Sequence, residues 1–304
     1  MLVVGKSGGG KTEALNALIG YERTVMASTI TEKTLLSGFS TIKQEHDLLY
    51  QLNDNLFIVK DMAPLISTNK DEQTSIMTDL RDAYDGHVVK RWGSATTDGK
   101  PLVKEWKGRF GFIAASTQAI NQAMIVAAQM GERYTRINYR TDPMEQIQRS
   151  LENQGFEEKM REDLKNAGHR LMRHYGEVAP KLGTAPLEPM VSRQTTLLAH
   201  LTAMLRTPVR LDYKTGEVRY TPAGEVGARL AKQFLVLMRS SALLDERKVI
   251  TPKDASLAYR VATDCIPEER IKVLIALLKG NRTTTEVEKF TETYGRIPNK
   301  TSER

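Results

Sequence analysis

The sequence has little of what would place it in several large classes of protein. Cys265 is the only cysteine, which excludes a disulfide-held fold and a cysteine-ligated zinc site and is typical of a reducing, cytoplasmic location. No apolar run reaches the roughly 18–20 residues that a membrane-spanning helix needs, so no membrane partner is expected. The five histidines lack the spacing of a metal site.

What is present is typical of a globular protein. The 304 residues are 40% hydrophobic and 27% charged, and this length suggests about two domains. Lysine and arginine number 44 against 37 acidic residues, which gives a formal net charge of +7. This moderate basic excess favours a polyanionic partner.

Two patterns of hydrophobicity divide the chain near residue 142. Before it, short apolar runs alternate with helix-like segments, which predicts an α/β core with a mostly parallel sheet covered on both faces. The expected strands are Leu2–Val4, Thr24–Ala27, Leu56–Val59, Phe110–Ala114 and Tyr134–Tyr139. The expected helices are Thr12–Ile19, Asp71–Tyr84 and Ile120–Gln129.

Beyond residue 142 the pattern is helical. A charged helical segment begins at Pro143 and ends in a proline-rich connector, Ala179–Pro189. Further helices are expected at 193–205, 226–244, 251–263 and 267–278, with a small hairpin at Asp212–Val218. We therefore expect an α/β core over 1–142, a helical segment and connector over 143–190, an all-helical region over 191–280 and a tail over 281–304.

A glycine-rich segment near the amino terminus is the strongest functional signal. Residues 5–12, Gly-Lys-Ser-Gly-Gly-Gly-Lys-Thr, match the phosphate-binding pattern G-x-x-x-x-G-K-[ST] between an apolar run and a helix-forming run. The glycines let backbone N–H groups turn toward a phosphate, and the next helix adds its N-terminal dipole. We expect Lys11 to reach the β and γ phosphates of ATP and Thr12 to hold Mg²⁺. The expected nucleotide-binding residues are Gly5, Lys6, Ser7, Gly8, Gly9, Gly10, Lys11 and Thr12.

An acidic residue that holds the magnesium shell is expected at the end of a second strand. Asp61 directly follows the apolar run Leu56–Lys60 and fits this role. Many ATPases carry a glutamate after this aspartate as the base for the attacking water, but the residue here is Met62. Asp61 could serve both roles through water, Asp71 or Glu72 could supply the base, or hydrolysis could be slow.

Two strand-like arms, Val88–Trp92 and Leu102–Trp106, flank a Thr-Asp-Gly turn and predict a β-hairpin. Between Gly86 and Phe110 the chain has six basic side chains and two acidic ones. Basic residues with two tryptophans suit contact with phosphates and stacking on bases, and the alternative is a solvated edge hairpin whose charges prevent aggregation. The residues expected to contact nucleic acid are Lys90, Arg91, Trp92, Lys100, Lys104 and Lys107.

In their order along the chain, these motifs resemble the AAA+ ATPases of the minichromosome-maintenance-like, helicase-type branch, in the form found in phages and mobile elements. The resemblance extends over nearly the whole chain. It implies a P-loop AAA+ core with a hairpin before the sensor 1 strand, followed by a helical lid. It also implies an ATP hydrolase that forms a ring, expected to be hexameric, with the hairpin pointing into a central pore where Lys90 and Arg91 could grip a strand of DNA.

The resemblance also assigns roles outside the phosphate loop. Thr117 takes the sensor 1 position, where the family has an asparagine, so its hydrogen bond to the γ-phosphate or the water is weakened. Arg133 matches the arginine finger that neutralises charge in a neighbouring subunit, with Arg136 and Arg140 as alternatives, and Arg229 matches sensor 2 on the lid. The expected catalytic residues are therefore Lys11, Asp61, Thr117, Arg133 and Arg229, and the expected metal-binding residues are Thr12 and Asp61.

Three functions follow from this pattern. We expect a ring-forming ATPase that couples ATP hydrolysis to translocation, unwinding or remodelling of single- or double-stranded DNA, in replication of a phage or mobile element. Met62 and Thr117 weaken hydrolysis and favour a second hypothesis, an ATP-gated oligomeric switch such as an initiator, loader or defence-system ATPase, with other replication or defence proteins as partners. A P-loop kinase is disfavoured by the helical lid and by the lack of an acceptor-site signature.

Both ends of the sequence suggest a shortened form of a longer protein. The phosphate loop begins five residues into the chain, so we expect no domain before it. The segment Thr283–Lys300 resembles the opening of a helix-turn-helix that then stops.

Overall fold

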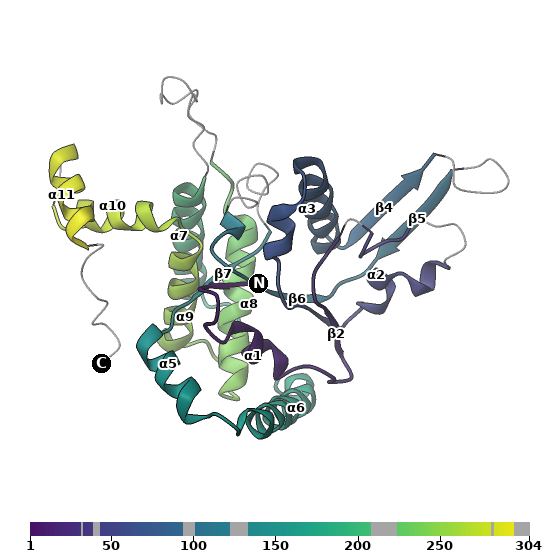
Figure 1. The fold of residues 1–304 in the computed structure, drawn as a ribbon. Helices are drawn as coiled ribbons and strands as arrows, with labels where there is room; N and C mark the ends of the chain where they lie inside the picture. Colours follow the sequence, from purple (N-terminus) through teal and green to yellow (C-terminus); the bar gives the residue numbers. More distant parts are fainter. Residues whose placement is uncertain are drawn as a thin grey trace. The chain divides into compact units, whose positions relative to one another are not determined.

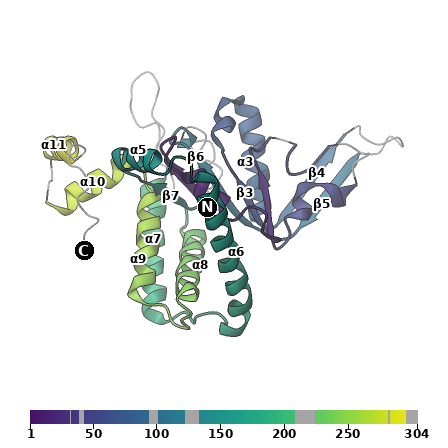
Figure 2. The same cartoon turned by 60° about the horizontal axis from the view of Figure 1, so that its bottom comes forward.

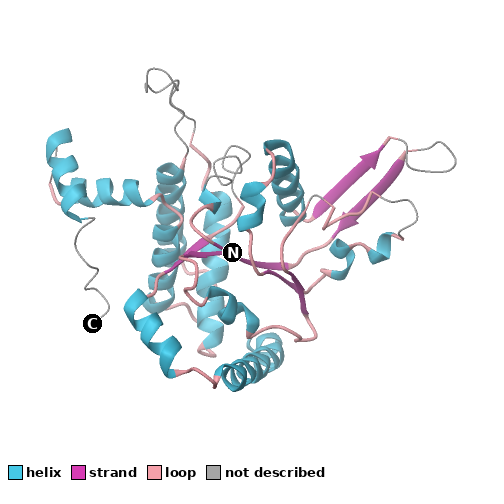
Figure 3. Ribbon diagram, viewed as in Figure 1, coloured by secondary structure: helices cyan, strands magenta, loops and turns pink. Residues whose placement is uncertain are grey.

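The computed structural model describes residues 1–31, 33–38, 43–93, 101–121, 133–207, 224–280 and 283–294 (Figure 1). The chain forms two compact units, Met1–Thr184 and Ala185–Arg304. The first unit contains the described strands, and the described residues of the second unit are helical or lie in connections between helices (Figure 3). None of the described helices combines the length and the apolar character that a bilayer crossing requires.

A five-stranded parallel sheet forms the centre of the first unit, which confirms the predicted α/β class. Its strands pair in the order β2-β3-β6-β1-β7. The strands are β1 (Leu2–Gly5), β2 (Thr24–Ala27), β3 (Leu56–Val59), β6 (Gly111–Ser116) and β7 (Arg136–Tyr139). Their bounds lie within two residues of the expected ones, because strands buried on both faces stand out as short apolar runs.

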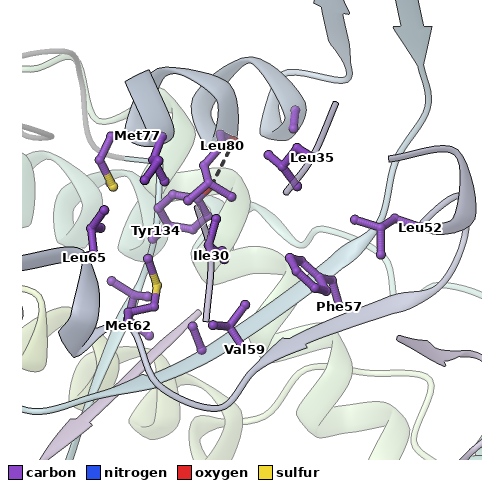
Figure 4. Close-up of a cluster of buried hydrophobic side chains, with 14 of the residues drawn as sticks. Ile30, Leu35, Leu52, Phe57, Val59, Met62, Leu65, Met77, Leu80 and Tyr134 are labelled. Carbon is purple, nitrogen blue, oxygen red and sulfur yellow. Dashed lines mark hydrogen bonds between the residues drawn. The ribbon is translucent and has the colours of Figure 1, made fainter. Parts of the chain in front are cut away.

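Helices cover both faces of this sheet. On one face, α3 (Lys70–Tyr84) packs against a cluster of buried side chains that includes Phe57 and Val59 (Figure 4). On the other face, α1 (Lys11–Asn16) packs against Ile58. Successive strand residues serve opposite faces, because side chains alternate along a β-strand. Shorter helical segments are η1 (Gln44–His46), α2 (Leu48–Gln51) and η2 (Ala63–Ser67).

The predicted hairpin is present as a separate antiparallel pair, β4 (His87–Trp92) and β5 (Leu102–Lys107). Figure 1 shows it beside α3, which β4 contacts. In its register Val88 faces Trp106, and both side chains are buried in the core cluster. The turn, which includes Asp98 and Lys100, lies outside the described residues.

The first unit extends beyond the 142 residues expected for the core. It continues with α5 (Pro143–Glu152) and the long α6 (Glu157–Leu182), which is seen along its length in Figure 2. α6 packs against α1 and so belongs to the same compact unit. The connector expected from Ala179 is helical as far as Leu182, because Pro180 lies in the last turn, where its missing N–H costs a single hydrogen bond.

The second unit contains the helices expected between residues 191 and 280. α7 (Pro189–Arg206), α8 (Ala228–Leu244) and α9 (Pro252–Asp264) pack against one another, and α10 (Glu268–Leu278) packs against α11 (Thr284–Tyr294). Buried residues of α8 at i, i+4 and i+8, namely Leu230, Phe234 and Met238, form the apolar side of that helix. The hairpin expected at Asp212–Val218 lies outside the described residues.

A buried carboxylate fixes the start of α9. Asp254 is fully buried, accepts two hydrogen bonds from Arg247 at 2.8 and 2.9 Å, and closes a capping box with Thr251. Burial alone would raise the pKa of Asp254, but the hydrogen bonds from Arg247, Ser241 and Thr251 outweigh it and hold the pKa well below its usual range. The ionised carboxylate therefore stabilises the folded state.

We expect Asp254→Asn to destabilise the second unit by about 1–3 kcal/mol, because it leaves buried donors without their charged acceptor. The depressed pKa gives stability that is present above the ordinary carboxyl pKa of about 3.9 and is lost as the pH falls toward the folded-state value. Denaturant unfolding measured between pH 3 and 7 checks both points. The variant should lose part of the acid sensitivity of the wild type, and Asp245→Asn, at an exposed neighbour of Arg247, should shift stability less.

Candidate functional site

Parallel pairing places the carboxyl ends of all five strands at one edge of the sheet, which is where ligands bind in open α/β sheets. β6 lies between β1 and β3, so the residues that follow β6 lie between the glycine-rich loop and Asp61. Ser116 ends β6 beside Val4 of β1, and the Met62 N–H donates to the Ala115 carbonyl at 2.9 Å. The sheet thus brings together three parts that lie far apart in the sequence: the glycine-rich loop, the segment after β6 where sensor 1 is predicted, and Asp61 after β3.

The glycine-rich loop joins β1 directly to α1. Gly8 and Gly10 have φ values of 74° and 84°, a left-handed conformation that favours glycine. The Lys11 side chain is buried and its Nζ donates to the carbonyls of Gly5 at 3.0 Å and Lys6 at 2.6 Å. The loop therefore already curves around the ammonium group of Lys11, as a phosphate-binding loop requires.

The end of β7 lies against this loop, a contact that no local sequence pattern indicates. A Cβ on Gly5 would lie 2.5 Å from the Tyr139 carbonyl oxygen, so only glycine fits there. The Thr141 hydroxyl lies 3.4 Å from the position of a Cβ on Gly9. The order of the strands in the sheet decides which strand ends beside the loop, and local sequence patterns do not predict that order.

Asp61 follows β3 at the same edge and is exposed. Its Oδ1 accepts a hydrogen bond from the Ala63 N–H at 2.8 Å, which orients the carboxylate in a turn. Met62 is 3% exposed and belongs to the core cluster, close to Leu65 in Figure 4. The position after Asp61 thus serves packing, and Asp61, Asp71 and Glu72 stay the candidates for the base.

The sensor 1 segment contains a second polar residue besides the predicted one. Thr117 is half-buried, and its carbonyl accepts from the Ile120 N–H at 3.2 Å. Ser116 is 1% exposed, and its hydroxyl has no hydrogen-bond partner within the described part of the chain. Buried hydroxyls are normally satisfied, so Ser116 is a residue that the sequence reading missed at this edge.

The predicted arginine finger lies away from the loop. Arg133 precedes β7 and therefore lies toward the opposite edge of the sheet from the loop, and the four residues of β7 span about 13 Å between these edges. It is 13% exposed and makes a bidentate ion pair with Asp85 at the end of α3, at 2.8 and 3.3 Å. Arg140, a predicted alternative, is exposed at the loop edge directly after Tyr139.

The other two arginines have partners of their own. Arg136 donates to the Asn138 side chain at 2.8 Å and to that of Asn121 at 2.5 Å. Arg229 lies 3.8 Å from Glu225 one turn earlier in the second unit. Arg229 belongs to the second unit and the glycine-rich loop to the first, and the sensor 2 role of Arg229 stays a prediction.

The inner face of the hairpin anchors it to the rest of the unit. Lys104 is 3% exposed and pairs with Asp47, itself 1% exposed, at 2.7 Å. Lys90 forms an ion pair with Asp79 of α3. The ammonium group of Lys104 is buried in an ion pair, and Lys90 is largely engaged as well, so this geometry argues against the predicted contacts of these two lysines with nucleic acid.

The tryptophans of the hairpin also serve packing. Trp106 is buried in the core cluster, and Trp92 packs on it. The Trp92 indole nitrogen lies 2.9 Å from the position of a Cβ on Gly38, so its ring fills the space beside that glycine. Stacking of bases on Trp106 does not fit this burial, whereas Trp92 is half-buried.

The outer face of the hairpin is exposed and of mixed charge. Arg91 and Lys107 are both exposed there. Lys107 and His87 each contact Glu105, at 2.7 and 2.9 Å, whereas Arg91 makes no ion pair with any described residue. Arg91 is thus the described hairpin cation best placed to meet an external anion, and Lys100 lies outside the described residues.

Comparisons with known proteins add nothing to this geometry. No family model matches the sequence, and no curated protein matches it either. Among the described residues, no three histidine, cysteine, aspartate or glutamate side chains gather as a metal cluster.

The two roles of the hairpin lysines can be separated. We expect Lys104→Met to destabilise the first unit by about 3–5 kcal/mol, because it leaves Asp47 buried without its counter-charge. Lys107→Met, on the exposed face of the same strand, should stay within about 0.5 kcal/mol of the wild type. Equilibrium unfolding in urea measures both, and equal stability of the two variants would contradict the buried pair.

Proposed function

We propose that this chain is a P-loop ATPase that binds ATP with Mg²⁺ at the carboxyl edge of its parallel sheet. The observation that carries the proposal is the loop of residues 5–12, whose left-handed glycines and buried Lys11 already have the conformation of a phosphate cradle. Lys11 would meet the β and γ phosphates, and Thr12 and Asp61 would hold the metal and its water. Magnesium would supply neutralisation of phosphate charge in the reaction.

The strand order supports a hydrolase of the AAA+ type. β6 lies between β1, which leads into the loop, and β3, which leads to Asp61. Ser116 and Thr117, at the end of β6, therefore lie between the residues proposed to hold the phosphates and the one proposed to hold the metal. A hydroxyl at this place can hydrogen-bond the γ-phosphate or the attacking water. This strand order supports the proposal of a helicase-type AAA+ protein, to which the order of motifs in the sequence has a resemblance.

Arg133 supports assembly into a ring. It lies at the edge opposite the loop, so it cannot serve the loop of its own chain, but it can serve the loop of a neighbour in a head-to-tail contact. We propose that copies of the chain form a closed ring, expected to be hexameric, in the cytoplasm. Hydrolysis then depends on the neighbour's Arg133, and the ion pair with Asp85 has to open before Arg133 acts.

We propose DNA as the substrate of this ring, in replication of a phage or mobile element. The exposed outer face of the hairpin, with Arg91 and Lys107, is the described surface that would contact the phosphates. A second candidate function is the ATP-gated switch without motor activity, acting with replication or defence proteins. The burial of Met62 and the engagement of Lys90 and Lys104 in ion pairs favour this second function.

Steady-state ATP hydrolysis with and without single- and double-stranded DNA tests the proposal. Lys11→Ala should lower hydrolysis by about 100-fold or more, because it removes the charge that faces the phosphates. Arg91→Ala should lower the stimulation by DNA about threefold to tenfold and leave hydrolysis without DNA unchanged. Slow hydrolysis that DNA does not change would exclude the motor and favour the switch. Absence of any Lys11-dependent hydrolysis or ATP binding would exclude both.

A mixing experiment tests whether Arg133 acts in a neighbouring subunit. Chains with Arg133→Ala alone and chains with Lys11→Ala alone should each be inactive. In an equal mixture, about a quarter of the interfaces pair an intact loop with an intact Arg133, so part of the hydrolysis should return. Arg140 lies at the loop edge of its own chain. If it acts on that loop, mixing Arg140→Ala with Lys11→Ala should restore no hydrolysis, because every loop in the mixture then lacks one of the two residues. If mixing restores nothing for Arg133→Ala, Arg133 is not the finger.

A further inference from the structure

The helix that follows the phosphate loop is too short to hold its own position. α1 has six residues, Lys11–Asn16, and is followed by turns up to Gly20. Helices much shorter than about 12 residues are marginal in water, because nucleation consumes most of the gain from their few hydrogen bonds. The sheet holds one side of α1, where Leu15 packs with Ile58. A contact from outside the sheet would add to the restraint of its first turn, which Lys11 and Thr12 form.

α6 contacts this segment at both of its ends. At the first turn, Arg161 binds Glu13 with two parallel hydrogen bonds, from Nη2 at 2.9 Å and from Nε at 3.1 Å. Beyond the last turn, the His169 Nε2 lies 2.9 Å from the Ile19 carbonyl oxygen, and its ring makes an edge contact with that of Tyr21. A fork of this kind restrains direction as well as distance.

Between these contacts the two segments touch through their backbones. A Cβ on Gly168 would lie 2.4 Å from the carbonyl oxygen of Ala17, closer than side-chain atoms come. Only glycine allows this approach, so Gly168 sets how near α6 comes to the end of α1.

The charges around Glu13 favour the same arrangement. The two hydrogen bonds from Arg161 join groups of opposite charge, and such charge-assisted hydrogen bonds are stronger than neutral ones. The Asn16 amide also donates to Glu13, at 3.4 Å.

We propose that Arg161 and Gly168 are positioning residues of the nucleotide site. Through them α6, which lies far along the chain from the phosphate loop, holds the first turn of α1 so that Lys11 and Thr12 meet the phosphates and the metal. This inference rests on the proposed binding of ATP. It makes α6 a part of the nucleotide site rather than of a separate helical segment.

Nucleotide titrations of the full chain test the proposal. Arg161→Gln should weaken binding of ATP and ADP about threefold to tenfold, because Arg161 affects the affinity only indirectly, through the position of α1. In hydrolysis, KM should rise more than kcat falls, and Arg161→Lys should recover part of the affinity. Arg173→Gln, an exposed arginine on the same helix, is the matched control and should bind like the wild type.

A double-mutant cycle shows whether Arg161 acts through Glu13. Glu13→Gln should weaken binding as Arg161→Gln does, and the double variant should be no weaker than the weaker single variant. Hydrogen exchange of the nucleotide-free chain gives a readout that needs no ATP. The amides of residues 13–20 should exchange faster in Arg161→Gln and in Gly168→Ala than in Arg173→Gln.

The outcomes separate this inference from the proposed function. If the wild type binds ATP in a Lys11-dependent way but Arg161→Gln binds as tightly as Arg173→Gln, the positioning role is wrong and the ATPase proposal stands. If the wild type binds no ATP, both fall. Unchanged amide exchange in Arg161→Gln and Gly168→Ala would show that α6 does not hold α1.

Discussion

The parallel pairing of β1 with β6 and β7 is the constraint on which the rest of this structure depends. It brings the carboxyl ends of five strands to one edge, so loops from distant parts of the sequence meet there. The same pairing requires covering helices on both faces, because each strand is buried on both sides. Gly5 shows how closely the parts fit, since the Tyr139 carbonyl oxygen occupies the space that any larger residue would need.

Charge pairing is the second constraint, and it limits which cations are available to a ligand. Lys104 lies in the interior beside Asp47, and an ammonium group in such a place is stable only with a close counter-charge. Two more exposed ion pairs join arginine to a carboxylate in the same way, Arg133 with Asp85 and Arg161 with Glu13. The described basic residues thus include some that hold elements together and others, such as Arg91, that are exposed on the surface.

α3 connects several of these features. It begins shortly after Asp61, and its buried face packs on β3, the strand that precedes Asp61. Along its length Asp79 binds Lys90 of the hairpin, the Leu80 carbonyl accepts the Tyr134 hydroxyl at 2.8 Å, and Asp85, directly after the helix, binds Arg133. A displacement of α3 would therefore act on the hairpin and on the segment before β7 together, and Asp61, the proposed metal ligand, lies shortly before this helix in the sequence.

The sequence by itself determined the parts that depend on local pattern. Short apolar runs predicted the five strands, a turn between alternating arms predicted the hairpin, and glycine spacing predicted the tight loop between β1 and α1, because each of these is encoded in neighbouring residues. The tertiary structure alone decided which of these residues are buried and which residues contact them from distant parts of the chain. It buried Lys104 and Trp106, which the basic hairpin had suggested as contacts for DNA. It also brought Tyr139 and Thr141 to the loop and Arg161 to the helix that follows it. Burial and long-range contact depend on the sheet order and on helix packing, and these are properties of the whole chain that no short segment carries.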